Sequence, residues 1–131
     1  MLLDTSGLLC LHHAAEAQHD DAVTFFEAAP LKVTHNYVLA EFVARAAARR
    51  FPRRETLDFV RDVDESPEII VVYVDQALHR RALSLLQERP DKSWSLCDAV
   101  SFVLMEHMNL VDALTTDHHF EQAGFKRLLR G

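Results

Sequence analysis

The chain has 131 residues, a length that suits one domain spanning 1–131. Its residues are 49% hydrophobic and 26% charged, and this globular composition excludes a disordered chain. Its longest apolar run, residues 69–74, is too short to cross a bilayer, and its first residues leave no room for a signal peptide. We therefore expect a cytoplasmic protein, with no membrane partner, whose two cysteines are free thiols. The net charge of −6 is opposite to that expected of a nucleic-acid binder, but acids gathered around a metal ion would be neutralised by it.

The first half of the chain alternates short strands with helices. In chain order we expect a strand at residues 2–3, helices at 8–11 and 14–29, a strand at 31–34, and helices at 35–50 and 52–65. Pro30 ends the second of these helices and Pro52 begins the last, because proline disfavours helix in the residue before it but suits a first helical turn.

The second half continues the alternation, and its β-branched run at residues 69–74 is the strongest strand signal. After it we expect a helix at residues 76–88, a polar loop at 89–94 and a helix at 95–108. A strand at 110–114, a short helical turn at 117–122 and a last strand at 125–128 follow. Strands separated by helices predict an α/β fold with a parallel sheet and helices on both faces. In such sheets ligands bind beyond the carboxyl ends of the strands.

Two acids follow strands directly. Asp4 comes after the first strand, and Asp117 follows the strand at residues 110–114 after two threonines. Both therefore lie where a parallel sheet presents its ligands. Taken singly, each is also explained as the N-cap of the helix that follows it.

Two further acids lie on helices with apolar surroundings. Glu41 has Tyr37, Val38 and Ala44 one turn away, so it needs a partner; the alternative is a salt bridge to Arg45. Asp98 stands three residues after Ser95, which fits a variant capping box, but the rest of its helix is almost wholly apolar and must be buried. Capping does not exclude metal binding.

Asp4, Glu41, Asp98 and Asp117 thus all belong to elements that can converge on one edge of the sheet. Packing them together without a cation would be costly, because like charges at close range disfavour one another's ionisation. Ligation by oxygen alone suits Mg²⁺ or Mn²⁺ better than zinc. From the residues alone the conclusion is a possible divalent-metal site in an α/β domain.

Four segments also carry a resemblance to a known family. Residues 2–6 (LLDTS), 37–42 (YVLAEF), 95–99 (SLCDA) and 114–120 (LTTDHHF) resemble, in order, the four motifs of the PIN-domain family, and within it the VapC-like toxin ribonucleases. The resemblance covers the whole chain. Some relatives carry a further acid just after the last aspartate, where this chain has His118 and His119, so we expect no fifth carboxylate ligand.

The resemblance implies a single PIN-like domain with a five-stranded parallel sheet in the order 3-2-1-4-5. It implies a hydrolase that uses Mg²⁺ or Mn²⁺, held by Asp4, Glu41, Asp98 and Asp117 as catalytic acids, to cut RNA and leave a 5′-phosphate and a 3′-hydroxyl. Ser6 and Thr115 would orient ligands or phosphate through hydrogen bonds. Toxin-like relatives usually pair with an antitoxin and usually form dimers, so both partners are expected here.

One basic stretch could contact RNA. It contains five arginines and no acid: Arg45, Arg49, Arg50, Arg53 and Arg54. Phosphate contacts from such a stretch would make RNA binding salt-dependent. The alternative is an ordinary solvated helix end.

Three other functions fit the sequence less well. The eight histidines lack zinc-site spacing, and the pairs His12–His13 and His118–His119 are interpreted as surface or helix-end residues. A receiver-type signalling domain would use Asp75, after the strand at residues 69–74, as its phosphate acceptor, but Asp4 lacks the neighbouring acid that such a domain needs. A PIN fold that binds RNA or protein without cutting is disfavoured, because all four acids are present.

Overall fold

The computed structural model describes residues 1–130, which fold around a five-stranded sheet in the order β3-β2-β1-β4-β5. Every neighbouring pair of strands is parallel. The strands are short: β1 Leu2–Leu3, β2 Lys32–His35, β3 Ile69–Val72, β4 Asp112–Leu114 and β5 Lys126–Arg127. Both the parallel sheet and the strand order confirm the prediction.

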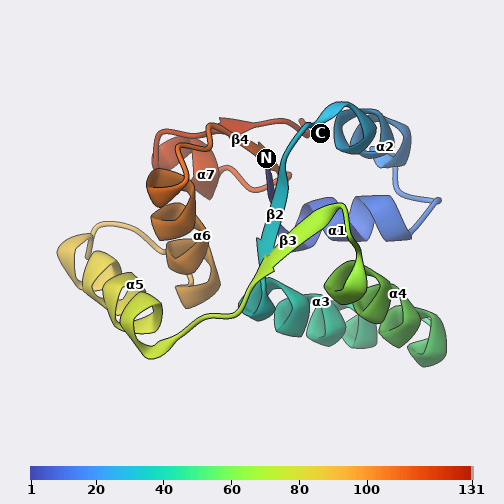
Figure 1. Cartoon of the computed structure of the whole chain (residues 1–131), viewed down its shortest axis with the longest axis horizontal. Helices are drawn as coiled ribbons and strands as arrows, with labels where there is room; N and C mark the ends of the chain where they lie inside the picture. The colour runs from blue at the N-terminus through green and yellow to red at the C-terminus, as the bar shows by residue number, and fades with distance from the viewer. Residues whose placement is uncertain (131) are drawn as a thin grey trace.

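Helices cover both faces of the sheet, as predicted (Figure 1). They are α1 Thr5–His12, α2 His19–Ala28, α3 Asn36–Ala48, α4 Arg53–Glu65, α5 Gln76–Glu88, α6 Leu96–His107 and α7 His119–Gln122. Helices α1 to α4 pack on one face, and α5 to α7 lie on the other. Among residues 1–130, no helix is both long and apolar enough to cross a membrane.

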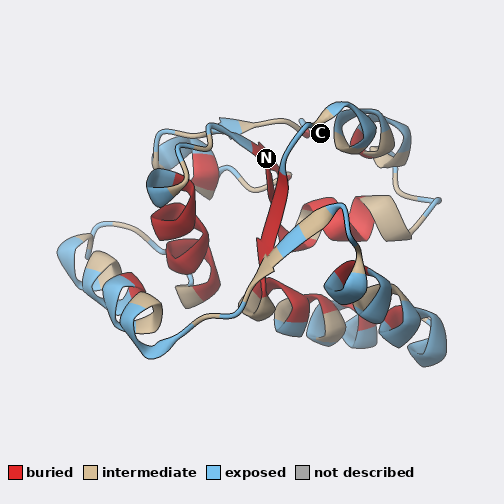
Figure 2. Cartoon of the chain, viewed as in Figure 1, coloured by how far each residue is buried: buried red, intermediate tan, exposed pale blue. Residues whose placement is uncertain are grey.

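Alternate residues of the central strands fill two separate cores, because successive side chains in a strand point to opposite faces. Leu3 and Leu114 pack with α1 to α4, whereas Leu2 and Ala113 pack beneath α6 and α7. Figure 2 shows α6 as the most deeply buried helix, in contrast to the exposed outer faces of α4 and α5. Asp98, which lies in the first turn of α6, is therefore held by a rigid element.

Helix α1 lies unusually close to β4, and Gly7 makes this possible. A Cβ atom at Gly7 would lie 2.0 Å from the carbonyl oxygen of Leu114, which is a backbone atom that cannot move aside. The close approach brings the beginning of α1 against the residues that follow β4. It therefore places the first and fourth sequence motifs side by side.

Two predictions of secondary structure need correction. Residues 14–18 form turns, not the beginning of a helix. The ring of His19, the first residue of α2, lies 2.7 Å from the carbonyl oxygen of Cys10 in α1, and this contact holds the start of α2 against α1. The strongest predicted strand ends at Val72 and is an edge strand, so Ile70 is 47% exposed. A β-branched composition predicts a strand but not its place in the sheet.

Candidate metal centre

Asp4 lies directly after β1 at the N-cap position of α1, yet its side chain makes no capping hydrogen bond. The residue is only 4% exposed. Its Oδ2 accepts a hydrogen bond from Thr115, while Oδ1 is buried and has no hydrogen-bond partner among residues 1–130. Burial raises the pKa of Asp4 to about 7, against the lowering effect of the Thr115 hydrogen bond, and the charges of Asp98 and Glu41 raise it further. The capping interpretation therefore does not explain this side chain.

A chain of hydrogen bonds orients Asp4. Thr115 Oγ1 donates its single hydrogen to Asp4 Oδ2 at 2.8 Å, so it must accept at its 3.1 Å contact with Ser6 Oγ. Ser6 in turn accepts from the backbone N–H of Thr116 at 2.9 Å. The backbone N–H of Asp117 also donates to Thr115 Oγ1, at 3.0 Å. The two residues predicted to have a supporting role thus connect Asp4 to the loop that carries Asp117.

Asp98 is the third residue of α6 and forms a complete capping box with Ser95. Its Oδ2 accepts from the backbone N–H of Ser95 at 3.0 Å, and its backbone N–H donates to Ser95 Oγ at the same distance. The residue is 7% exposed. Burial raises its pKa, and the nearby Asp117 carboxylate acts in the same direction, whereas His119 lowers it. Asp98 therefore caps its helix while facing the other acids.

Glu41 occupies the boundary of the site. Its side chain is 27% exposed and lies 3.4 Å from the guanidinium of Arg45, so the salt bridge considered as an alternative is present. The Glu41 charge nevertheless raises the pKa of both Asp4 and the buried Cys97 thiol, which places it close to the other acids. An exposed pair of this kind stabilises a helix by a few tenths of a kcal/mol at most, about 0.3–0.5 kcal/mol, so Arg45 leaves Glu41 available for a cation.

Asp117 lies in the loop after β4, with its side chain 25% exposed. Its Oδ1 accepts from the backbone N–H of His119 at 2.9 Å and lies 3.1 Å from His119 Nδ1. The same nitrogen is 3.4 Å from Asp98 Oδ2. The imidazole of His119 therefore stands between two of the acids.

The structure thus brings the four acids together beyond the carboxyl ends of β1 and β4, with Glu41 on the second turn of α3 and Asp98 on the first turn of α6. These residues fit a divalent cation, because Asp4 presents a buried carboxylate oxygen without a hydrogen bond, surrounded by further carboxylates. A buried charge in that position is costly unless a cation compensates it. Carboxylate oxygens are the donors that Mg²⁺ and Mn²⁺ prefer.

The arginine stretch spans the end of α3 and the beginning of α4, and all five side chains are exposed. Two of them have acidic partners: Arg45 pairs with Glu41, and Arg49 contacts Glu16 at 2.5 Å and lies over the ring of Phe51. Within residues 1–130 the remaining three, Arg50, Arg53 and Arg54, form no ion pair. Any contact with phosphate therefore falls mainly to these three.

The interpretation of the paired histidines as surface or helix-end residues fits their positions, since His12 ends α1 and His119 begins α7, but it missed the contacts that these two rings make. His12 packs against Phe42 and Phe59, with ring centroids 5.7 and 4.7 Å away. His119 is 20% exposed and faces Asp98 and Asp117, whereas His118 is 64% exposed. The one signal for His119 in the sequence was its position two residues after Asp117.

The position of Asp75 and the strand order contradict the receiver-domain alternative. Asp75 is exposed, follows the edge strand β3 and caps α5 by accepting from the backbone N–H of Leu78 at 2.8 Å. The observed order, with β1 in the middle and β3 at the edge, differs from the 2-1-3-4-5 order of receiver folds.

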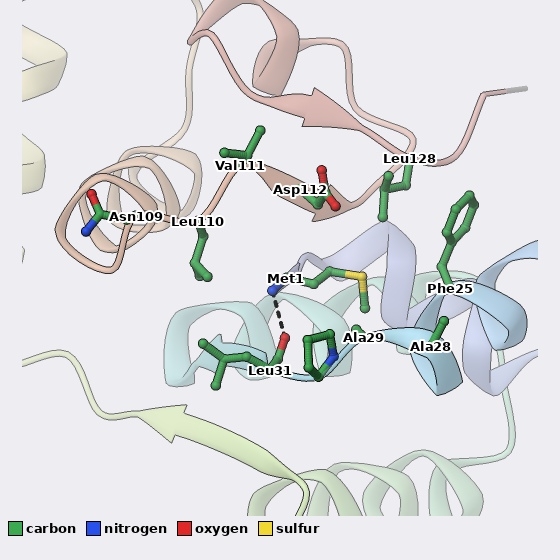
Figure 3. Close-up of a pocket in the computed structure, with 11 residues that line it drawn as sticks. Met1, Phe25, Ala28, Ala29, Leu31, Asn109, Leu110, Val111, Asp112 and Leu128 are labelled. Carbon is green, nitrogen blue, oxygen red and sulfur yellow. Dashed lines mark hydrogen bonds between the residues drawn. The ribbon is translucent and has the colours of Figure 1, made fainter.

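A separate cavity of about 380 Å³ lies at the opposite edge of the sheet (Figure 3). Met1, Leu31 and Val111, which line it, precede β1, β2 and β4, whereas the acids follow their strands. The amino group of Met1 donates to the carbonyl oxygen of Leu31 at 2.7 Å and closes this end of the sheet. The cavity is mostly apolar and takes no part in the acidic site.

Comparison with known proteins agrees with this arrangement. A family model described as the PIN domain matches residues 1–126. The 23S rRNA-specific endonuclease VapC20 of two Mycobacterium tuberculosis strains, CDC 1551 / Oshkosh and ATCC 25618 / H37Rv, is 28% identical over 126 residues, which is 95% of each chain. The crystal structure of Mycobacterium tuberculosis VapC20, described as a sarcin–ricin loop cleaving toxin, matches with a TM-score of 0.88 at 27% identity. That match covers 99% of this chain and 98% of the other.

Proposed function

Because the chain belongs to the PIN domain family, we propose that it is a divalent-metal-dependent endoribonuclease and the toxin of a toxin–antitoxin pair. The observation that carries the proposal is Asp4 Oδ1, a buried carboxylate oxygen without a partner that lies among three further acids. Leaving such an oxygen unpaired costs a folded core free energy, whereas a metal-dependent hydrolase can use it as a ligand. The similarity to VapC20 along almost the whole chain supports the choice of RNA as substrate.

In this proposal Asp4, Glu41, Asp98 and Asp117 hold Mg²⁺ or Mn²⁺. The cation supplies Lewis-acid activation of water and stabilises negative charge on the phosphate. Thr115 keeps Asp4 in one rotamer by donating to Oδ2, which leaves Oδ1 free to act as a ligand. Ser6 holds Thr115 and the backbone of Thr116, so the loop carrying Asp117 keeps its position relative to Asp4.

The RNA substrate would approach across the exposed carboxyl edge of the sheet. Glu41 and Asp117 form the accessible side of the site, with 27% and 25% of their side chains exposed, while Asp4 forms its floor. The unpaired arginines at the beginning of α4 lie on the same side of the sheet as α3, which carries Glu41. They offer phosphate contacts beyond the scissile bond.

The relatives suggest which RNA to try first. The names of the VapC20 proteins specify 23S rRNA, and that of the solved structure specifies the sarcin–ricin loop. A stem–loop is recognised mainly by its shape and its unpaired bases. We propose that this chain also cuts a structured RNA, with the sarcin–ricin loop as the first candidate. Such an enzyme would act in the cytoplasm, as a homodimer, and be held inactive by an antitoxin chain.

The decisive experiment incubates purified protein with end-labelled RNA carrying the sarcin–ricin loop. Cleavage is expected with Mg²⁺ or Mn²⁺, none in EDTA, and none with Asp98→Asn. Asp112→Asn is the matched control, because Asp112 is an exposed acid at the opposite edge of the sheet, and it should cut like the parent. Cleavage that survives exhaustive chelation would sink the metal mechanism. A protein that binds this RNA without cutting it under any metal condition would be a silent RNA-binding module.

A further inference from the structure

We propose that His119 is a ligand of the metal through Nδ1, so that the site combines carboxylate oxygens with one nitrogen and prefers Mn²⁺ to Mg²⁺. This proposal rests on the proposed metal-dependent function.

The spacing of the ligand atoms supports this assignment. His119 Nδ1 is 3.1 Å from Asp117 Oδ1 and 3.4 Å from Asp98 Oδ2. Neighbouring ligands of an octahedral ion at about 2.1 Å lie about 3 Å apart. One ligand atom each from Asp117, His118 and His119 also lies within 4.8 Å of the others. Nδ1 is thus about as far from each of these two oxygens as one ligand of a cation is from the next, while Asp98 itself lies outside the group of three whose ligand atoms are all within 4.8 Å.

The surroundings of His119 Nδ1 support the assignment of this nitrogen as a metal ligand independently. Within the described part of the chain, Nδ1 is shielded from solvent and forms no hydrogen bond, although it faces two carboxylates. The other ring nitrogen, Nε2, lies 3.4 Å from Ser93 Oγ. Metal-binding histidines commonly donate from one nitrogen to an oxygen acceptor and ligate through the other. A lone pair at Nδ1 facing two carboxylates would be repelled unless a cation lay between them.

Asp4 provides a second observation that points to a cation at this place. Its Oδ1 is also buried without a partner, in a residue 4% exposed, and the charge of Asp98 acts on it. Asp4 and His119 therefore each present an unpartnered ligand atom in the neighbourhood of Asp98. Both belong to side chains that their surroundings hold in place.

His119 is held rigidly. Its backbone N–H donates to Asp117 Oδ1 at 2.9 Å, and the next residue, Phe120, is fully buried beside Phe102. His118 differs in its exposure and in the acids that it reaches: its side chain is 64% exposed, and among residues 1–130 the one carboxylate within ion-pair distance of it is Asp117, at 3.8 Å, although its ring also lies beside that of His119. We therefore assign the ligand to His119 and use His118 as its matched control.

A nitrogen ligand alters the choice of metal. Mn²⁺ shares the preference of Mg²⁺ for carboxylate oxygens but, as a transition-metal ion, accepts an imidazole nitrogen more readily than Mg²⁺, which favours oxygen donors and keeps several waters. Removing the imidazole should therefore weaken Mn²⁺ binding by at least about tenfold and leave Mg²⁺ binding nearly unchanged. The alternative is a protonated His119 that neutralises the two acids; it predicts that removal leaves the ratio of the two affinities as it was.

Pulsed electron paramagnetic resonance of the Mn²⁺-loaded protein tests the assignment without RNA. Directly bound imidazole gives a ¹⁴N coupling, which we expect in the parent and in His118→Gln but not in His119→Gln. Absence of the coupling in the parent, or its survival in His119→Gln, would overturn the proposal, as would loss of the coupling in His118→Gln alone. Circular dichroism verifies that both variants fold.

Calorimetric titration with MnCl₂ and with MgCl₂ gives the second readout. A fall in the Mn²⁺ to Mg²⁺ affinity ratio in His119→Gln, with no change in His118→Gln, supports the nitrogen ligand; an equal ratio in all three proteins overturns it. RNA cleavage by a parent that shows no nitrogen coupling would refute this inference alone. A parent that binds neither metal would refute the proposed function as well.

Discussion

Thr115 and Asp4, which are 111 positions apart in the chain, share a buried hydrogen bond of 2.8 Å in which the threonine is the donor. Because a hydroxyl has one hydrogen, Thr115 can only accept from its other two neighbours, Ser6 and the backbone of Asp117. A single side chain therefore determines the rotamer of Asp4 and the position of the loop after β4.

Replacing Thr115 with valine keeps the shape of the side chain but removes the hydroxyl. Asp4 then loses its donor, and Ser6 and the N–H of Asp117 lose their acceptor. We expect cleavage to slow by about ten- to a hundredfold, as when the partner of a metal ligand is removed. Thr115→Ser, which keeps the hydroxyl, should stay within a few-fold of the parent. Equal rates for the valine and serine variants would show that this hydroxyl is dispensable.

Neutralising Asp4 separates a metal site from a helix cap. In EDTA the parent keeps a buried carboxyl group near Asp98 and Glu41, which is unfavourable when it is charged. Asp4→Asn should therefore abolish cleavage while leaving the melting temperature in EDTA unchanged or raising it. Added Mn²⁺ should raise the melting temperature of the parent more than that of the variant. A variant that melts several degrees lower in EDTA and still cuts RNA would instead identify Asp4 as a structural residue.

The sequence was sufficient to predict the sheet order, through its resemblance to a family, and to name the four acids that the fold brings together. It was not sufficient for His119, because an adjacent pair of histidines has no periodicity that distinguishes an inward ring from an exposed one. Nor did it reveal Gly7, whose importance arises from the carbonyl of Leu114 more than a hundred residues later. Both depend on contacts between distant segments, which local patterns do not contain.

The arginines at the beginning of α4 provide a test of RNA binding. Arg53 and Arg54 are exposed and unpaired among residues 1–130, whereas Arg49 is tied to Glu16 and Arg50 lies outside both helices, in the turn that joins α3 to α4. Arg53→Ala/Arg54→Ala should weaken RNA binding and reduce the slope of log affinity against log salt by about 1.4, for two contacts to single-stranded RNA. Arg80→Ala/Arg81→Ala, on the exposed side of α5, is the control. The same slope in parent and variant would make this stretch a solvated helix end.

His35 gives the fold a dependence on pH that is separate from the acidic site. It is fully buried at the N-cap of α3, where Nδ1 accepts from the backbone N–H of Val38 and Nε2 lies 2.8 Å from Ser101 Oγ on α6. Since Nδ1 is the acceptor, the hydrogen resides on Nε2 and is donated to Ser101. A second proton would displace the cap and bury a charge, and burial accordingly lowers the pKa of His35 to about 3.

Acid should therefore destabilise the parent through His35. Its usual pKa is 6.5, so below that pH the unfolded chain takes up a proton that the folded chain refuses until about pH 3. The neutral ring makes its full contribution to the free energy of unfolding above pH 6.5. Below that pH the contribution falls by up to about 1.4 kcal/mol per pH unit. The asparagine side chain introduced by His35→Asn can still cap α3 but does not titrate, so urea unfolding of this variant should show a shallower loss of stability between pH 6.5 and 5. His107→Asn, at an exposed position on α6, should retain the slope of the parent. If His35→Asn keeps the full parental slope, other groups cause the acid sensitivity and folding does not lower the pKa of His35.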